Sequence, residues 1–276
     1  MLNVDEYFLY NCNRKVSGKM VKIIFSDFDY TLMDYYGDKN YFDDYQIDVI
    51  KKVQEKGIKF CIVSGRCLSF FEQFPNLMEV VDYIIGSNGS SIYDVKKKEY
   101  LYTKLIEKDE FNKLVDYAID NRFDFILNCI GNRYQYGNFS DMNLLNYETN
   151  KEYDCEQVIL FLHKDYADDF VKHMEYYDTV CVNNAGFWGD TCTFDVNDKS
   201  ISKGYAIEYL CDSLNIEKDY TIAFGDGIND ISMFDAVSKG IAVGNAQDSV
   251  KNQADDVTLS YDNNGVFKYI ENNILK

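Results

Sequence analysis

Short apolar segments of strand length alternate with amphipathic segments of helix length at both ends of this chain. The apolar segments lie at 21–26, 58–66, 83–86, 220–226 and 240–244. Segments with helical periodicity lie between or after them, at 43–56, 203–214, 229–236 and 265–274. Continuous apolar strands separated by helices are typical of a parallel sheet covered on both faces. We therefore expect an α/β fold whose core is a Rossmann-like, doubly wound parallel sheet built from both chain ends.

The middle of the chain has a different pattern. Its apolar residues alternate with polar ones over short segments, and two helical segments lie among them, at 109–121 and 165–176. Such alternation is typical of an antiparallel sheet with one solvated face. We expect an inserted α+β domain with a mainly antiparallel sheet. Its predicted strands lie at 91–94, 99–103, 124–130, 157–162, 179–183 and 191–196.

These patterns give the expected domain boundaries. The core domain is predicted to comprise residues 20–87 and 192–276, and the inserted α+β cap domain residues 88–191. The apolar pattern begins only at Met20, so we expect residues 1–19 to be either a disordered N-terminal extension or an upstream start, without chemistry. The segments near 86–90 and 186–197 are the expected hinges between the two domains.

Composition excludes several classes of function. The net charge is −18 and the longest basic run covers only 96–98, whereas nucleic-acid binding needs clustered cations. No apolar run approaches the roughly 18 residues that cross a bilayer, and the first residues lack a signal-peptide core. Eight scattered cysteines without a C-x-x-C pair, and only two histidines, argue against a zinc site and for reduced thiols. We therefore expect a cytoplasmic protein that binds neither nucleic acid nor membranes.

Polar side chains follow the predicted strand ends, where open parallel sheets bind their ligands. Crowded carboxylates repel one another and raise each other's pKa values, and a divalent cation removes that repulsion. Oxygen ligands with room for water and phosphate suit Mg²⁺, while a hydroxyl, a lysine and helix N-terminal N–H groups suit phosphate oxygens. The side chains in question are Asp27, Asp29, Ser64, Lys203, Asp226, Asn229 and Asp230.

The spacing of Asp27 and Asp29 indicates a shared task. In an extended chain, residues two apart point to the same side, so both carboxylates can approach one phosphorus atom. One carboxylate can then act as the nucleophile, and the other can protonate the leaving oxygen and later deprotonate water.

Four motifs carry a resemblance to a known family. D-x-D-x-T at 27–31, Ser64-Gly-Arg, Lys203-Gly and G-D-G-x-N-D at 225–230 resemble the motifs of the haloacid dehalogenase (HAD) superfamily. The phrases "IIGSNGSSIYD" and "GIAVGNAQDSVKNQADDVT" are similar to the Cof-like sugar-phosphate phosphatases, which carry a class IIB cap. The resemblance extends from Met20 over nearly the whole chain.

The resemblance implies roles for individual residues. Asp27 would be the nucleophile and Asp29 the general acid/base. Mg²⁺ would be held by the Asp27 carboxylate, the Asp29 backbone carbonyl and Asp226, with Asp230 supporting from the same loop. The positions expected to bind the phosphoryl group are Thr31, Ser64, Gly65, Lys203 and Asn229.

Some positions do not transfer from the family. Tyr30 stands where many members have glycine, and we expect its side chain to point away from the acids. Arg66 is predicted to face the substrate or to bridge to the cap. The cap matches by pattern only, so the contacts that choose the substrate remain open.

Two other readings of the sequence fail and two remain. Gly225 and Gly227 suggest a dinucleotide loop, but Asp230 stands where the third glycine is required. His163 and His173 lie in the insert, away from the motifs, so a serine hydrolase lacks its base. We expect a Mg²⁺-dependent phosphatase acting on a small phosphorylated metabolite, as a monomer or weak homodimer. A phosphosugar mutase and a non-catalytic phosphometabolite sensor are the alternatives.

Overall fold

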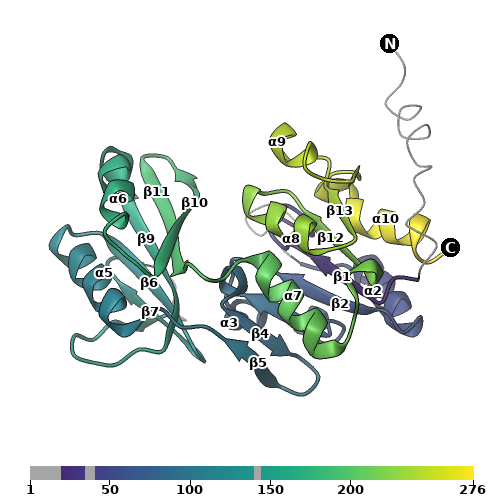
Figure 1. The fold of residues 1–276 in the computed structure, drawn as a ribbon, viewed down its shortest axis with the longest axis horizontal. Coiled ribbons are helices and arrows are strands. Elements are labelled where there is room, and N and C mark those ends of the chain that lie inside the picture. The colour runs from purple at the N-terminus through teal and green to yellow at the C-terminus, as the bar shows by residue number, and fades with distance from the viewer. Residues whose placement is uncertain (1–19, 35–40, 140–143) are drawn as a thin grey trace, which may run out of the picture.

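Two β-sheets organise the computed structural model, which describes residues 20–34, 41–139 and 144–276 (Figure 1). The extension expected at residues 1–19 lies outside the described residues. The strands of the larger sheet are β1 (Ile23–Ser26), β2 (Lys59–Val63), β3 (Tyr83–Gly86), β4 (Ser91–Asp94), β5 (Glu99–Thr103), β12 (Thr221–Gly225), β13 (Lys239–Ala242) and β14 (Asp256–Val257). Those of the smaller sheet are β6 (Asp124–Cys129), β7 (Asn132–Tyr136), β8 (Leu145–Asn146), β9 (Cys155–His163), β10 (Val180–Trp188) and β11 (Thr191–Asp198).

The larger sheet has the strand order β14-β13-β12-β1-β2-β3-β4-β5. Its strands from β14 to β3 are parallel, and β4 and β5 add an antiparallel edge. Strands from the two ends of the sequence meet at its centre, where Ser26 of β1 is in register with Phe224 of β12. The carboxyl ends of β1 and β12 therefore lie side by side.

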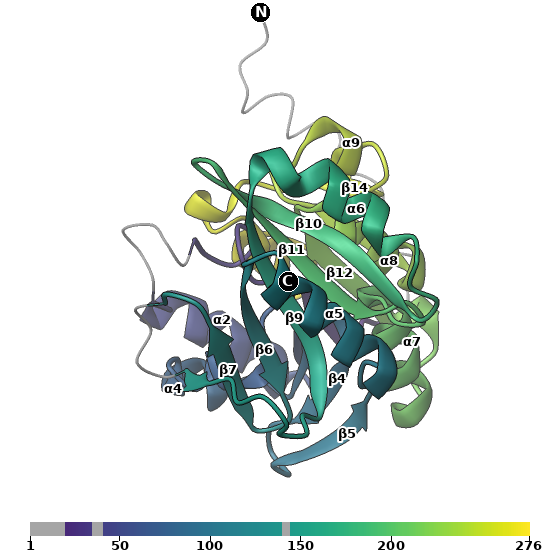
Figure 2. The ribbon, with the colours of Figure 1, turned by 90° about the vertical axis from the view of Figure 1, so that its left-hand side faces the viewer.

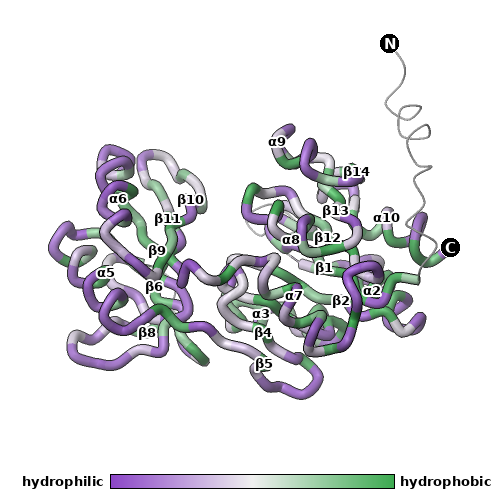
Figure 3. The backbone as a smooth tube through the Cα atoms, in the orientation of Figure 1, coloured by the Kyte–Doolittle hydropathy of each residue, from purple (hydrophilic) through white to green (hydrophobic). Residues whose placement is uncertain are grey.

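Helices cover both faces of the larger sheet. Successive residues of a strand point to opposite faces, and in the central strands both sets are apolar and need covering. Ile24 packs into a buried cluster with helices α2 (Asp44–Glu55), α3 (Leu68–Phe71), α4 (Pro75–Met78) and α10 (Gly265–Asn273). Phe25, one residue on, packs into a second cluster with α7 (Lys203–Leu214), α8 (Ile231–Ala236) and α9 (Asp248–Lys251). The hydrophobic residues follow the central strands in Figure 3. The doubly wound α/β core is confirmed.

Local capping chemistry fixes the first helix of the core. Asp43 accepts a hydrogen bond from the Gln46 backbone N–H (2.9 Å), and the Gln46 side chain accepts one from the Asp43 N–H (3.0 Å). This reciprocal capping box satisfies two otherwise unpaired donors. The helix ends before Gly57, whose φ of +75° turns the chain into β2.

The smaller sheet forms the inserted domain. Its order is β10-β11-β9-β6-β7-β8, and every pair except β7–β8 is antiparallel. Helices α5 (Lys108–Asp120) and α6 (Ala167–Met174) pack on one face, through a buried cluster that includes Phe125, Leu160 and Phe194. Viewed from the side of this domain, strands β6, β9, β10 and β11 lie in front of the core (Figure 2).

The expected domain boundaries differ from this topology. The hairpin β4–β5 was expected in the insert, but Ile92 of β4 pairs with Ile85 of β3, so the hairpin extends the core sheet. At the other boundary, the inserted domain was expected to end at residue 191, but β11 belongs to the smaller sheet as far as Asp198. By sheet membership, the inserted domain lies between Thr103 and Asp198. The local alternation of a hairpin does not indicate which sheet it will join.

None of the described helices combines the length and the apolarity that a membrane span requires.

Candidate active site

The candidate active site lies where β1 and β12 end. Asp27 follows β1 directly, and its backbone N–H donates to the Phe224 carbonyl of β12 (2.9 Å). Asp226 follows β12 directly. Because the two strands are parallel neighbours, both acids emerge at the same edge of the sheet.

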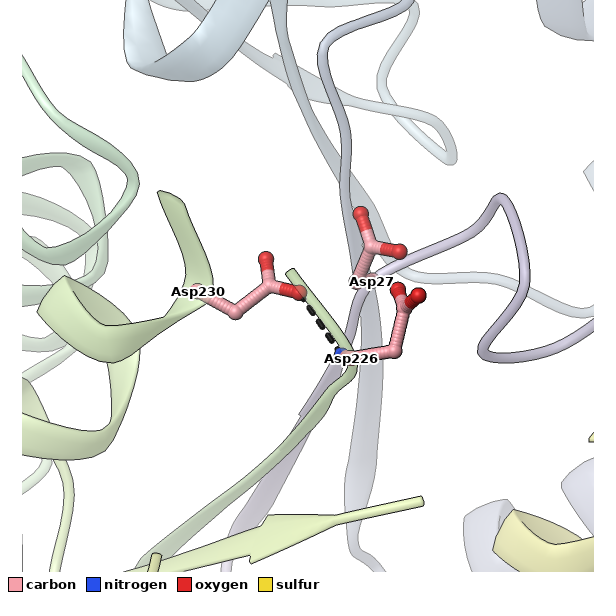
Figure 4. A group of neighbouring side chains, drawn as sticks. All are labelled: Asp27, Asp226 and Asp230. Carbon is pink, nitrogen blue, oxygen red and sulfur yellow. Dashed lines mark hydrogen bonds between the residues drawn. The ribbon is translucent and has the colours of Figure 1, made fainter. Parts of the chain in front are cut away.

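Three acids converge at this edge (Figure 4). One carboxylate oxygen of each of Asp27, Asp226 and Asp230 lies within 4.8 Å of those of the other two. Asp230 also organises its own loop, because its Oδ2 accepts hydrogen bonds from the backbone N–H groups of Asp226 and Gly227, each at 2.9 Å. The motif G-D-G-x-N-D thus supplies both an acid that faces Asp27 and a second acid that holds the loop in place.

A single lysine lies between two of the acids. Lys203 Nζ is 2.6 Å from Asp27 Oδ1 and 2.6 Å from Asp230 Oδ1, and the residue is only 2% exposed. It is the first residue of α7, after the N-cap Ser202, where the positive end of the helix disfavours a cation unless anions face it. Burial lowers the pKa of Lys203, but the charges of Asp230 and Asp27 outweigh burial and raise it, so the side chain is an ammonium.

The acids outnumber the buried cation. Burial and the neighbouring Asp230 raise the pKa of Asp27 well above its usual range, although Lys203 opposes this. The same two causes raise the pKa of Asp226 to about 7. If all three acids were ionised, one ammonium would leave an excess of two negative charges, and the ligand atoms are all oxygens. These residues fit a divalent cation such as Mg²⁺, which would relieve the repulsion.

Asp29 is not one of these three acids and has a cation of its own. Arg66 Nε donates to Asp29 Oδ2 and Arg66 Nη2 to Asp29 Oδ1, both at 3.0 Å. The guanidinium also lies over the ring of Phe70, 4.5 Å from its centroid. Arg66 therefore contacts the predicted acid/base, and its charge also opposes the burial that raises the pKa of Asp195 in the inserted domain. That Arg66 faces the substrate or bridges to the cap stays a prediction.

The predicted phosphate-binding residues are brought to the same edge of the sheet, but their present partners differ. The Thr31 hydroxyl donates to Asp226 Oδ1 (3.2 Å), and the Ser64 hydroxyl accepts from the Arg66 backbone N–H (3.1 Å). Gly65 follows Ser64 in this loop, and Asn229 is exposed in the loop between Asp226 and Asp230. Phosphate contacts by these residues stay predictions.

Tyr30 occupies a turn and not an extended strand. Its φ is +58°, in the left-handed region that glycine adopts more readily than residues with a side chain. The side chain is 43% exposed and packs edge-on against Tyr261, with ring centroids 5.9 Å apart.

Two residues that the sequence did not single out reach the site. Asn88 lies in the turn after β3, and its Oδ1 accepts a hydrogen bond from Asn229 Nδ2 (3.2 Å). Its Nδ2 donates to Asp195 Oδ2 on β11 of the inserted domain (3.0 Å). The quoted phrase "IIGSNGSSIYD" contains Asn88, so a signal was present, but it named no role. Asp195 had no sequence signal beyond its place within the expected hinge 186–197.

The sequence matches the model of a known family. The model of the haloacid dehalogenase-like hydrolase family matches residues 24–270. The chain belongs to this family, and it is an enzyme of the phosphoric monoester hydrolase class, as the motifs predicted.

Curated relatives cover most of the chain. It is 26% identical over 256 residues to 5-amino-6-(5-phospho-D-ribitylamino)uracil phosphatase YcsE of Bacillus subtilis, covering 92% of this chain and 96% of that protein. It is 25% identical over 231 residues to the phosphoglycolate phosphatase of Methanobrevibacter smithii, covering 83% of this chain and 89% of that protein.

Solved structures share the fold. A phosphatase of the HAD superfamily from Bacteroides thetaiotaomicron superimposes with a TM-score of 0.78 at 23% identity, over 94% of this chain and 97% of that one. A HAD subclass IIB sugar phosphatase superimposes with a TM-score of 0.76 at 23% identity, over 93% of this chain and all of the other. The predicted HAD fold, with an inserted domain of the IIB kind, is confirmed.

Proposed function

We propose that the enzyme hydrolyses small phosphomonoesters through a phosphoryl intermediate on Asp27, with Mg²⁺ as its cofactor. The observation that carries the proposal is the buried contact of Lys203 with both Asp27 and Asp230, beside Asp226. A nucleophilic carboxylate, an ammonium and an acidic metal site at one sheet edge suit phosphoryl transfer, in which charge stabilisation provides most of the catalysis.

The chain's own residues divide the reaction between them. Asp27 attacks the phosphorus atom, and its oxygen replaces the oxygen of the leaving alcohol. Asp29 gives that alcohol its proton and then takes one from the water that hydrolyses the aspartyl-phosphate. Lys203 and the loop of Ser64 hold the equatorial oxygens of the phosphoryl group. When bound, Mg²⁺ would supply charge neutralisation for the acids and the phosphate, held by Asp27, Asp226 and the Asp29 carbonyl, with Asp230 supporting.

The inserted domain would choose the leaving group and exclude bulk water. Its sheet face opposite α5 and α6 carries Asp195, which bonds to Asn88 near the site. The relatives are named for a ribitylaminouracil phosphate and for phosphoglycolate, and both compounds are candidate substrates here. We also propose that the enzyme works in the cytoplasm, as a monomer or weak homodimer.

The test is a substrate panel with Mg²⁺ in which inorganic phosphate is measured. The panel comprises sugar phosphates, flavin mononucleotide, pyridoxal phosphate, p-nitrophenyl phosphate and the two compounds for which the relatives are named. Asp27→Asn removes the nucleophile and should reduce turnover to background. Release of phosphate by this variant at the wild-type rate would refute the mechanism. An isomeric sugar phosphate as the product would instead indicate a mutase, and tight binding without turnover a sensor.

A further inference from the structure

One short turn joins three of the four motifs to the inserted domain. This turn is formed by Ser87–Gly89 after β3, and we call it the β3 turn. The Ser87 N–H donates to the Arg66 carbonyl and the Asn88 N–H to the Ser64 carbonyl, each at 3.0 Å. The β3 turn is therefore fixed by its backbone to the loop of the second motif.

The same turn also contacts the third and fourth motifs. A Cβ placed on Gly89 would overlap the Ser202 carbonyl oxygen and lie 3.3 Å from the Lys203 backbone nitrogen, so the turn lies directly against the start of α7. On the other side, Asn88 Oδ1 accepts from Asn229 Nδ2 in the loop of Asp226 and Asp230.

The inserted domain holds the turn from the opposite direction. Asp195 accepts from Asn88 Nδ2 at 3.0 Å, and Asn197 Nδ2 donates to the Ser87 carbonyl at 3.0 Å. The Ser87 hydroxyl donates to Glu156 of β9, also at 3.0 Å. All three partners lie on strands of the smaller sheet.

The backbone of the turn is in an unfavourable conformation. Ser87 has a φ of +49° and Asn88 a φ of +57°, both in the left-handed region that disfavours residues with a side chain, and Gly89 follows at +108°. Consecutive residues of this kind persist only where the surroundings fix them, and they concentrate at functional sites. The contacts of the turn provide that fixation.

We propose that Asn88 is a positioning residue that couples the placement of the inserted domain to the alignment of the catalytic loops. Asp195 fixes the orientation of the Asn88 amide, and the amide oxygen then holds Asn229 and its loop. The contact with Asp195 requires the inserted domain to lie where it does here, so displacement of that domain removes one support of the loop. The inference rests on the proposed function, because it assigns this alignment a role in phosphoryl transfer.

The first test is Asn88→Gly, which deletes the side chain and keeps the turn. Glycine adopts a φ of +57° without cost, so the turn itself is kept, although the loss of the donor to Asp195 should lower the melting temperature by several degrees. We expect kcat to fall about tenfold while KM changes less than about threefold, because a misaligned group near the reacting centre affects the transition state. Asn215→Gly is the matched control, since Asn215 has a similar φ of +51° at the far end of α7. It should leave kcat unchanged.

The second test is a double-mutant cycle with Asp195→Ala. If Asp195 acts through Asn88, the double variant should be no slower than Asn88→Gly alone, because the chain of contacts is already broken. Additive losses would show that the two residues act separately, and wild-type kcat in Asn88→Gly would show that the turn has no catalytic consequence. Either result overturns the proposal.

A readout without substrate separates this inference from the proposed function. Hydrogen–deuterium exchange of the amides at 225–230 should rise in Asn88→Gly and in Asp195→Ala, but not in Asn215→Gly. Unchanged exchange in the first two variants would overturn the coupling even if the enzyme proved not to be a phosphatase. Faster exchange in an enzyme without phosphatase turnover would keep the coupling and refute only the proposed function.

Discussion

Arg66 donates one hydrogen bond to each carboxylate oxygen of Asp29, both at 3.0 Å, while Lys203 donates one to Asp27 at 2.6 Å. Two acids only two residues apart therefore have separate cations. The Asp27 pair is buried, whereas the side chains of Arg66 and Asp29 are about a quarter exposed. In the proposed mechanism, the nucleophile would thus be buried and the acid/base partly open to solvent.

Arg66→Lys keeps the charge but loses the two-point contact, because an ammonium cannot match the guanidinium geometry. We expect kcat to fall about tenfold, equivalent to about 1.4 kcal/mol, with steady-state kinetics as the measurement. The melting temperature should stay within about 2 °C, because a partly exposed ion pair contributes roughly 0–1 kcal/mol.

The control for Arg66→Lys is Lys52→Ala, which breaks the exposed pair of Lys52 with Asp48 on α2, away from the site. It should leave kcat unchanged. Equal kcat values for wild type and Arg66→Lys would show that the hold on Asp29 is not needed for catalysis.

Asp226→Asn should remove the response of the protein to Mg²⁺. At about a hundredfold excess over Kd, a ligand adds about 2.7 kcal/mol to stability, so Mg²⁺ should raise the wild-type melting temperature by roughly 5 °C. Without metal the variant should melt at the same or a higher temperature, because burial and Asp230 disfavour the Asp226 carboxylate. Differential scanning fluorimetry with and without Mg²⁺ measures both effects.

Asp48→Asn is the control for the metal test, since Asp48 lies on the exposed side of α2 and is 57% exposed in its side chain. It should keep the full Mg²⁺ shift. A full shift in Asp226→Asn would mean that the cation binds elsewhere.

Much of the core could be predicted because its signals are local. The continuous apolar segment 83–86 coincides with β3, and the expected helix 203–214 coincides with α7. The acids of the site were predictable for a related reason: Asp27 and Asp226 each follow an apolar strand, and parallel strands bring such positions together.

What the sequence could not predict depends on pairing between distant residues. The hairpin β4–β5 has the alternation of the inserted sheet, and only its pairing with β3 assigns it to the core. Strand β7 is not predicted, because polar residues interrupt its apolar pattern. Only the folded structure shows that Tyr134 packs into the core of the inserted domain. Asn88 and Asp195 are 107 residues apart, so no local pattern reports their contact.

Gly89→Ala should destabilise the protein more than Gly57→Ala does. Both glycines have positive φ, +108° and +75°, so alanine is strained at each and costs about 1 kcal/mol from backbone conformation. At Gly57 nothing lies within 4 Å of the new Cβ, whereas at Gly89 it would overlap the Ser202 carbonyl. We expect a further loss of about 1–3 kcal/mol for Gly89→Ala, measured by urea unfolding. Equal losses in the two variants would show that the β3 turn can move away from α7.

Glu156 and Glu110 should give opposite pH dependences of stability. Burial raises the pKa of Glu156 from its ordinary value of 4.5, although Ser87 and Ser91 donate to it. As pH rises, Glu156 therefore loses its proton in the unfolded chain at a lower pH than in the folded protein. Its ionisation lowers the stability of the folded protein progressively above pH 4.5, fully above the folded pKa, and not at all below 4.5. Glu156→Gln should therefore gain stability over wild type as pH rises.

For Glu110, burial raises the pKa, but hydrogen bonds from Thr179 and the Asp178 N–H outweigh burial and lower it from 4.5. Its contribution to stability is present above 4.5 and is lost as pH falls through the folded pKa. Glu110→Gln should therefore lose about 1–3 kcal/mol at neutral pH, through donors left without an acceptor, and less in acid. Urea unfolding of both variants and wild type at about pH 4 and about pH 8 measures these differences. The contributions of the other acids to the pH dependence are the same in variant and wild type, so they cancel in each comparison. If the unfolding free energies of wild type and Glu156→Gln changed in parallel with pH, Glu156 would ionise freely in the folded protein. If those of wild type and Glu110→Gln changed in parallel, the Glu110 carboxylate would gain nothing from Thr179.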